Sequence, residues 1–287
     1  TQDINKSIHY YTLAANQNDI KAQRYLGEIY FKGIYIPRDI NKALHFLTMG
    51  ANQNEPNSQY LLGTIYYEGK FISQDINKAI HYFTLSANQN DIRSQYSLGR
   101  IYLQGGFISQ DINKSIHYFT LAANQNDMLS QRFLGLICYQ GRYIPRDIIK
   151  SLHYLKLASN QNDRIAQFYI GMIYYEGDIV SRDINKAIHY MTLAADQNDS
   201  TAQYFIGKFY YNGKILPKDI NKGIHYLTLA ANQNNDSAQY FLGSIYYNGP
   251  LALKNINKAI HYFTLAAEQN HSEAQLILGS IYFNGIY

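Results

Sequence analysis

Apolar residues recur along this chain at the spacing of amphipathic helices, in two alternating kinds of segment. Residues 75–88 illustrate the first kind, with apolar side chains at Ile76, Ala79, Ile80, Phe83 and Ala87. Residues 91–105 illustrate the second kind, with a stripe made by Ser94, Leu98, Ile101 and Tyr102. Positions three and four apart share one face of an α-helix, so both stripes predict helices that bury one side.

Capping residues mark where these helices start and stop. Asp75 precedes the first helix and Asp91 precedes the second, and a carboxylate there accepts hydrogen bonds from the free amides of the first turn. Gly105 follows the second helix, where glycine commonly ends helices. Prolines that block helix continuation stand in counterparts of the loop that follows, at Pro37, Pro145 and Pro217. The predicted unit is helix–turn–helix–loop, and no strand pattern competes with it.

The segment Asp-Ile-Asn-Lys and its variants recur with a fixed step of 36 residues, so the unit fills the whole chain. The copies begin at Asp3, Asp39, Asp75, Asp111, Asp147, Asp183, Asp219 and Asn255. Helix pairs of this length cannot bury their faces alone and must stack on their neighbours. We therefore predict an all-α fold, an α-solenoid (right-handed superhelix) of eight 36-residue repeats. It would occupy residues 1–287 as a single domain, with its first helix at about 3–16 and its last at about 271–284.

A glycine stands inside the second helix of every copy. Glycine in a helix interior costs roughly 1 kcal/mol relative to alanine, so its repetition indicates that another helix approaches closely there. These glycines are Gly27, Gly63, Gly99, Gly135, Gly171, Gly207, Gly243 and Gly279.

Residues 202–213 resemble the Ala-Gln-x-x-Leu-Gly-x-x-Tyr-x-x-Gly signature of the Sel-one-like repeat (SLR) family, a branch of the tetratricopeptide-repeat superfamily. Residues 186–190, Lys-Ala-Ile-His-Tyr, followed by Ala194 and Ala195, resemble a second segment of the same family. The resemblance covers essentially the whole chain. It implies that the Ala-Gln…Gly helix lines the concave side of the solenoid and the Asp-Ile-Asn-Lys helix lies on the convex side. Known members of the family are mostly adaptors and scaffolds.

Differences among the copies separate a constant scaffold from variable positions. Gln23 and its seven counterparts are all glutamine, whereas other positions of the same helix change from copy to copy or are mostly aromatic. Tyrosine and arginine are favoured at binding hot spots because each combines a large area with a polar group. The predicted partner-binding residues of the concave groove are Arg24, Glu28, Phe31, Tyr60, Tyr67, Tyr96, Arg100, Arg132, Tyr139, Phe168, Tyr175, Tyr204, Lys208, Tyr211, Tyr240 and Tyr247.

This pattern predicts a non-enzymatic protein–protein interaction scaffold or adaptor that binds a peptide or partner protein along the groove. A second interpretation remains open, in which the aromatic residues are inter-repeat packing and the variable positions are simply solvated. The sequence shows no catalytic constellation, so we predict neither enzymatic activity nor a cofactor. A regulatory arm of an enzyme lying outside this segment is a further alternative.

Composition limits the classes of partner that the sequence predicts. The chain has 25 basic and 21 acidic residues and a net charge of +4, which is too balanced to predict nucleic-acid binding. No apolar run approaches the ~18 residues of a membrane span. The single cysteine, Cys138, excludes an internal disulfide framework and suits a reducing compartment, which favours a cytoplasmic location. We interpret Cys138 as a small buried filler.

A histidine occupies one position of every Asp-Ile-Asn-Lys helix. Neighbouring repeats lie roughly 10 Å apart, which is too far for two imidazoles to share one ion, so we predict no metal site. An exposed polar row is the simpler interpretation. The histidines are His9, His45, His81, His117, His153, His189, His225 and His261.

The two terminal helices keep the internal apolar pattern, for example at Ile8 and Leu276, instead of showing a polar outer face. Solenoids normally need capped ends for solubility. The preferred explanation is that the segment belongs to a longer protein. The alternative is head-to-tail self-association through the uncapped ends, which would make the chain a structural, filament-forming protein.

Overall fold

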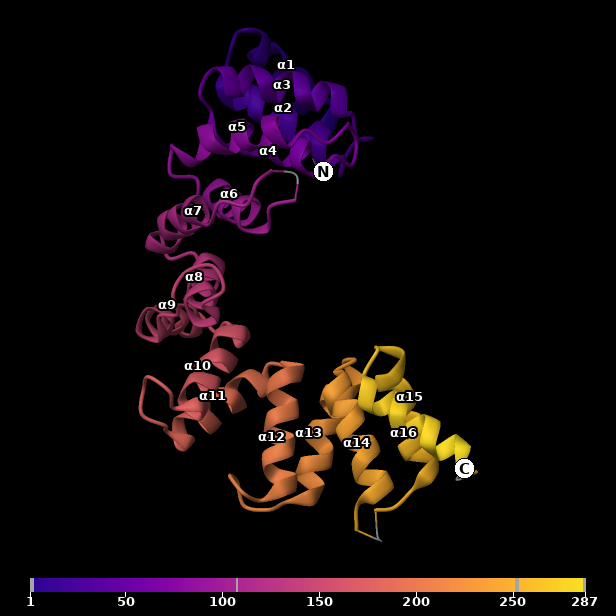
Figure 1. The fold of residues 1–287 in the computed structure, drawn as a ribbon. Helices are drawn as coiled ribbons and strands as arrows, with labels where there is room; N and C mark the ends of the chain where they lie inside the picture. The colour runs from indigo at the N-terminus through magenta and orange to yellow at the C-terminus, as the bar shows by residue number, and fades with distance from the viewer. Residues whose placement is uncertain (1–2, 107, 251–252, 286–287) are drawn as a thin grey trace. The chain divides into compact units, whose positions relative to one another are not determined.

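The computed structural model describes residues 3–106, 108–250 and 253–285, which form sixteen α-helices and no strand (Figure 1). The first eight are α1 (Ile4–Asn16), α2 (Ile20–Lys32), α3 (Ile40–Asn52), α4 (Pro56–Glu68), α5 (Ile76–Ala87), α6 (Ile92–Gln104), α7 (Ile112–Asn124) and α8 (Met128–Gln140). The others are α9 (Ile148–Asn160), α10 (Arg164–Glu176), α11 (Ile184–Asp196), α12 (Ser200–Asn212), α13 (Ile220–Asn232), α14 (Asp236–Asn248), α15 (Ile256–Glu268) and α16 (Ser272–Phe283).

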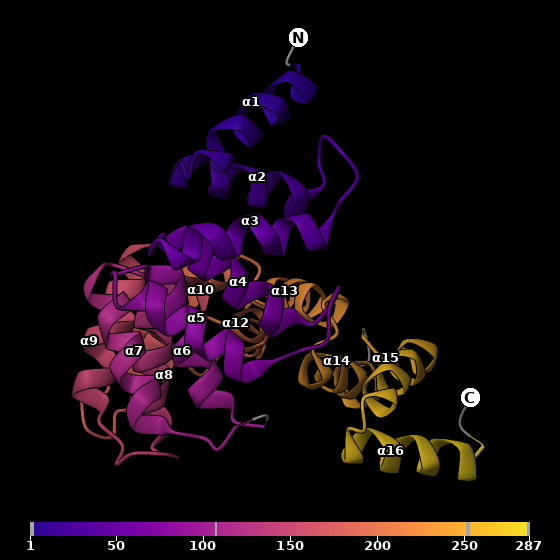
Figure 2. The same ribbon diagram turned by 90° about the horizontal axis from the view of Figure 1, so that it is seen from above.

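The helices form two compact units, residues 1–134 and 135–287, with the boundary inside α8. Within the units, α2, α4, α6, α10, α12 and α14 each pack extensively on the odd-numbered helix that follows, and less extensively on the one that precedes. Figure 2 shows the successive hairpins from a second side. The all-α fold of repeated helical hairpins confirms the predicted α-solenoid class. The prediction that residues 1–287 act as one domain stays a prediction.

The capping residues identified in the sequence begin the helices as predicted. The Asp75 carboxylate accepts a hydrogen bond from the Lys78 amide at 2.9 Å, and the Asp91 carboxylate accepts one from the Ser94 amide at 2.8 Å. Asn255 replaces the aspartate at the eighth copy and its side-chain oxygen accepts from the Lys258 amide at 2.9 Å. A neutral amide oxygen therefore starts the helix as the carboxylates do.

Two devices that the sequence pattern did not predict shape the connections. The short turn between each odd helix and the even helix after it places an asparagine in the left-handed region, as at Asn90 with φ 63°. Asparagine tolerates this conformation better than most residues. In the loop after several even helices, the residue before the capping aspartate donates to a carbonyl of the helix end. Gln74 donates to the Tyr67 carbonyl at 2.6 Å, and Arg146 donates to the Tyr139 carbonyl at 3.1 Å.

The glycines inside the even helices mark close helix contacts, as predicted. A Cβ added at Gly99 would lie 2.6 Å from the ring of Phe119, which is fully buried in α7. Equivalent contacts occur at the six other internal copies, against phenylalanine, leucine or methionine side chains. At Gly279 in α16 the same position meets nothing within 4 Å. The glycine therefore opens the space that the following odd helix fills with a large apolar residue.

The constant glutamine of the even helices connects neighbouring repeats. Gln95 is fully buried, donates to the Ala87 carbonyl at 3.2 Å and accepts from the Gln125 side chain at 2.8 Å. Gln59 and Gln89 repeat the side-chain pair at 2.8 Å one copy earlier. Because Gln95 bridges three helices, it satisfies polar groups that burial would otherwise leave without a partner.

Candidate functional site

The predicted groove residues all lie on the even-numbered helices, and all but Phe168 are partly exposed. Phe168 is 8% exposed and packs in a core cluster with Met191 and Phe209. It therefore presents little surface to a partner. By helix, the set comprises Arg24, Glu28 and Phe31 on α2, Tyr60 and Tyr67 on α4, Tyr96 and Arg100 on α6, Arg132 and Tyr139 on α8, Phe168 and Tyr175 on α10, Tyr204, Lys208 and Tyr211 on α12, and Tyr240 and Tyr247 on α14.

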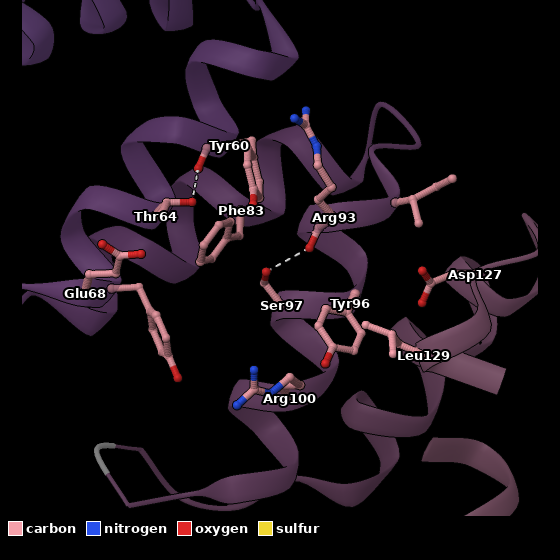
Figure 3. Close-up of a pocket in the computed structure, with 12 residues that line it drawn as sticks. Tyr60, Thr64, Glu68, Phe83, Arg93, Tyr96, Ser97, Arg100, Asp127 and Leu129 are labelled. Atoms are coloured by element: carbon pink, nitrogen blue, oxygen red, sulfur yellow. Dashed lines mark hydrogen bonds between the residues drawn. The ribbon is translucent and has the colours of Figure 1, made fainter. Parts of the chain in front are cut away.

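An open pocket of about 360 Å³ in unit 1 brings four of these residues together, namely Tyr60, Tyr67, Tyr96 and Arg100. Figure 3 shows Tyr60, Thr64 and Glu68 on α4 and the side chains of Arg93, Tyr96 and Arg100 on α6 around it. The remaining lining residues are Phe83, Ile92, Ser97, Asp127 and Leu129.

The tyrosines of this pocket also take part in packing between helices. The ring centroids of Tyr60 and Tyr67 lie 5.9 and 6.5 Å from that of the buried Phe83 in α5. The Tyr96 ring lies 6.0 Å from both Phe119 and Phe133. Each ring therefore has one side held by the core while its remaining surface lines the pocket. Packing between helices, one of the two interpretations left open by the sequence, is therefore observed at these positions, and partner binding there stays a prediction.

Arg93 is a pocket residue that the predicted set lacks. Its guanidinium lies 4.1 Å from the centroid of the Tyr60 ring, pairs with Asp91 at 2.7 Å and donates to Asn57 at 2.7 Å. These three partners hold Arg93 against one wall. The residue type at this position varies among the copies, and that variation was the only sign in the sequence that Arg93 could belong to the site. Its contact with Tyr60 of the preceding repeat is recognised only in the folded structure.

At the start of unit 1 two predicted groove residues neutralise each other. Arg24 pairs with Glu28 at 2.9 Å, and Glu28 also pairs with Lys32 at 3.0 Å. Both carboxylate oxygens of Glu28 are therefore engaged within α2. Phe31 is partly buried and packs against the core cluster that contains Leu47.

In unit 2 the Tyr139 hydroxyl donates to Glu176 at 2.7 Å, and Glu176 pairs with Arg146 at 3.1 Å. Burial and the hydrogen bond to Glu176 raise the pKa of the Tyr139 hydroxyl. Other predicted tyrosines of this unit contact aromatic neighbours, such as Tyr175 with Phe209 at 5.4 Å. Tyr240 and Tyr247 both pack on Phe263, at 5.9 and 6.2 Å.

The structure places the histidine row on the surface, as the sequence predicted. All eight are exposed, and each ring whose neighbour is aromatic packs edge-on against it, as in His81 with Tyr82 at 5.2 Å. Among the described residues no three metal-ligating side chains come together. Cys138 is 2% exposed, which confirms that it is buried, and burial raises the pKa of its thiol. Within the same residues no helix has the length and apolar character needed to span a bilayer.

The repeated hairpins and their shared glutamine and glycine contacts define a helical-repeat protein of the tetratricopeptide-like superfamily. The profile of the Sel1 repeat matches nine consecutive segments, and the chain therefore belongs to the Sel1 repeat family. Seven segments each hold an even helix and the odd helix after it, while α1 and α16 fall in the two shorter terminal matches. The segments are residues 1–19, 20–55, 56–91, 92–127, 129–163, 164–199, 200–235, 236–271 and 272–287.

Solved structures of this fold resemble the chain closely. The crystal structure of c5321, a protective antigen of uropathogenic Escherichia coli strains, is 28% identical, with a TM-score of 0.87. That match covers 99% of this chain and 61% of c5321, so the chain spans less than two thirds of that relative. A Sel1 repeat protein from Oxalobacter formigenes is 27% identical, with a TM-score of 0.81, over 98% of this chain and 82% of its own. A search of curated protein sequences found no significant match. Proteins of the Sel1 family generally mediate protein–protein interactions as non-catalytic scaffolds.

Proposed function

We propose that this chain is an interaction scaffold whose even-numbered helices bind an extended peptide or a partner protein. The pocket between α4 and α6 carries the proposal, because it combines tyrosine rings anchored on the core with charged groups at its walls. Rings that are already held lose little conformational freedom when a partner covers them. Alternate side chains of an extended chain suit a row of such positions.

Replacing Tyr67, Tyr175 and Tyr211 together with alanine is expected to weaken peptide binding at least about tenfold, because each substitution removes a large contact area. Peptides selected from a random display library on the unmodified protein are the probe, and fluorescence anisotropy measures their affinity. The control replaces His81, His189 and His225, which are exposed on odd helices. Circular dichroism verifies that both triple variants keep their helix content.

Two results would argue against the scaffold. In one, the tyrosine and histidine triple variants bind the selected peptides with the same affinity as the unmodified chain. In the other, the library yields no peptide that binds at all. Affinity lost in the tyrosine variant alone supports the proposed face.

Self-association is a second candidate, supported by the exposed apolar face of α16. Leu276 and Phe283 are 72% and 91% exposed there, whereas Tyr240 and Tyr247, their counterparts in α14, pack on Phe263. Tyr11 of α1 stands seven repeats before Phe263 and is the matching residue that a second copy would bring.

If this interface forms, mass photometry of the chain will show multimers that grow with concentration. Aspartate at Leu276 and Phe283 is expected to return the protein to monomers, because it would place charge in the apolar contact. A strictly monodisperse monomer at every concentration would remove this candidate and leave the peptide-binding scaffold unaffected.

A further inference from the structure

Several cations of the even-helix face are neutralised by carboxylates of the chain itself. Arg24 pairs with Glu28 at 2.9 Å, and Arg93 pairs with Asp91 at 2.7 Å. A partner that approaches either arginine meets a charge that is already compensated. These residues therefore contribute shape and hydrogen bonds more than net charge.

Arg100 differs, because it forms no ion pair with any residue that the structure describes. Its guanidinium lies 5.9 Å from the centroid of the Tyr96 ring, and Figure 3 shows the two side chains near each other at the pocket. A narrower recess of about 40 Å³ is lined by Arg100, Tyr96 and Tyr67, together with Ser97 and Ile101. Arg100 is partly buried, so water screens its charge less than it would on an open surface.

The same combination recurs in unit 2, three repeats later. Lys208 stands at the position of Arg100, Tyr204 at that of Tyr96 and Tyr175 at that of Tyr67. The Lys208 ammonium lies 5.5 Å from the centroid of the Tyr204 ring and 3.5 Å from its hydroxyl oxygen. No carboxylate among the described residues pairs with it. The other six copies carry Glu28, Thr64, Leu136, Met172, Ser244 and Ser280 at this position.

We propose that each unit holds one site for a carboxylate side chain of the bound peptide, at Arg100 in unit 1 and at Lys208 in unit 2. The proposal rests on the peptide-binding function proposed above and specifies its ligand as a chain with glutamate or aspartate. The cation supplies a charge-assisted hydrogen bond to the carboxylate. The adjacent phenols add hydrogen-bond donors, and their rings cover the methylene groups of the acidic side chain.

Two acidic residues also line the unit 1 pocket, and they affect how tightly it is expected to bind an acidic peptide. Asp127 is engaged as a helix cap, accepting from the Ser130 amide at 2.7 Å. Glu68 is exposed on the last turn of α4 and would repel an acidic ligand. Its counterpart in unit 2, Glu176, is held by Tyr139 and Arg146. Replacing Glu68 with glutamine should therefore strengthen acidic-peptide binding about twofold, since an exposed charge is well screened.

The test measures capture of the whole chain on arrays of degenerate dodecapeptides in which the central residue is fixed as Glu, Gln or Lys. We expect Glu to exceed Gln by about tenfold, which corresponds to one charge-assisted hydrogen bond. Arg100→Gln combined with Lys208→Gln should abolish this preference, so that the variant captures the Glu and Gln arrays equally. The matched control, Lys70→Gln with Lys214→Gln, removes the same charge from exposed loop positions and should keep the preference.

The outcomes separate this inference from the function on which it rests. Equal capture on the Glu and Gln arrays leaves the scaffold standing and overturns the carboxylate sites. A Glu preference that survives Arg100→Gln with Lys208→Gln, or that the loop control also loses, overturns them as well. Displacement of the Glu peptides by single-stranded DNA at equal concentration would assign the two cations to a nucleic-acid backbone instead. Failure of every array to capture the chain overturns both proposals.

Discussion

Replacing Gly99 with valine is expected to destabilise the contact between α6 and α7 by about 3 kcal/mol, at the upper end of overpacking costs. A Cβ at this position already lies 2.6 Å from the Phe119 ring, and valine adds two further carbons. The ring cannot withdraw easily, because Phe119 is fully buried and stacks on Phe133 at 5.1 Å. Urea unfolding followed by circular dichroism measures the loss, and hydrogen exchange should locate it in α6 and α7.

Gly279→Val is the matched control for this substitution. Gly279 occupies the same repeat position in α16, but an added Cβ meets nothing within 4 Å. Valine is a somewhat better helix former than glycine, so the change should be neutral or stabilising by a few tenths of a kcal/mol. If both substitutions cost the same, helix propensity rather than contact with Phe119 would explain the repeated glycine, and our account of the packing would be wrong.

The fold could be predicted from the sequence because each local signal is repeated in register. Asp75, Asp91 and Gly105 start and stop helices through contacts with their own first or last turn, which sequence spacing alone can specify. The glycine stripe likewise indicated close packing without revealing its partner. The partner, Phe119, lies 20 residues away in the next helix and is recognised only once the hairpin is folded.

The sequence could predict that the candidate residues lie on the even-numbered helices, but not which of them form hydrogen bonds or ion pairs or become buried. Arg24 and Glu28 stand four residues apart on a helix, a spacing that permits an ion pair, but the sequence analysis assigned both to partner binding and did not predict their pairing. Tyr139 and Glu176 are 37 residues apart, and their hydrogen bond depends on how successive repeats stack. Phe168 occupies the position of Tyr96, yet its ring is buried against Phe205 because no hydroxyl needs to reach water. Which cations stay unpaired is therefore a property of side-chain geometry.

The hydrogen bonds between repeats lead to the second large effect, which is expected for Gln95→Leu. Leucine keeps much of the volume but removes the bonds to the Ala87 carbonyl and the Gln125 side chain. Two lost hydrogen bonds, one with a partner left partly buried and unsatisfied, should cost about 2–3 kcal/mol. Because stability in a repeat array is a sum of unit and interface terms, the loss should appear mainly at the interface of α6 with α7.

Gln275→Leu tests whether the interface, rather than the residue type, carries this cost. Gln275 is exposed in α16 and donates to the Ala267 carbonyl at 3.0 Å, but no glutamine of a following repeat donates to it among the described residues. Its replacement should cost below about 1 kcal/mol, the value of a single exposed hydrogen bond. A double-mutant cycle of Gln95→Ala and Gln125→Ala would then measure the shared bond directly. Additive losses in that cycle would mean that the two glutamines stabilise their own helices and do not couple the repeats.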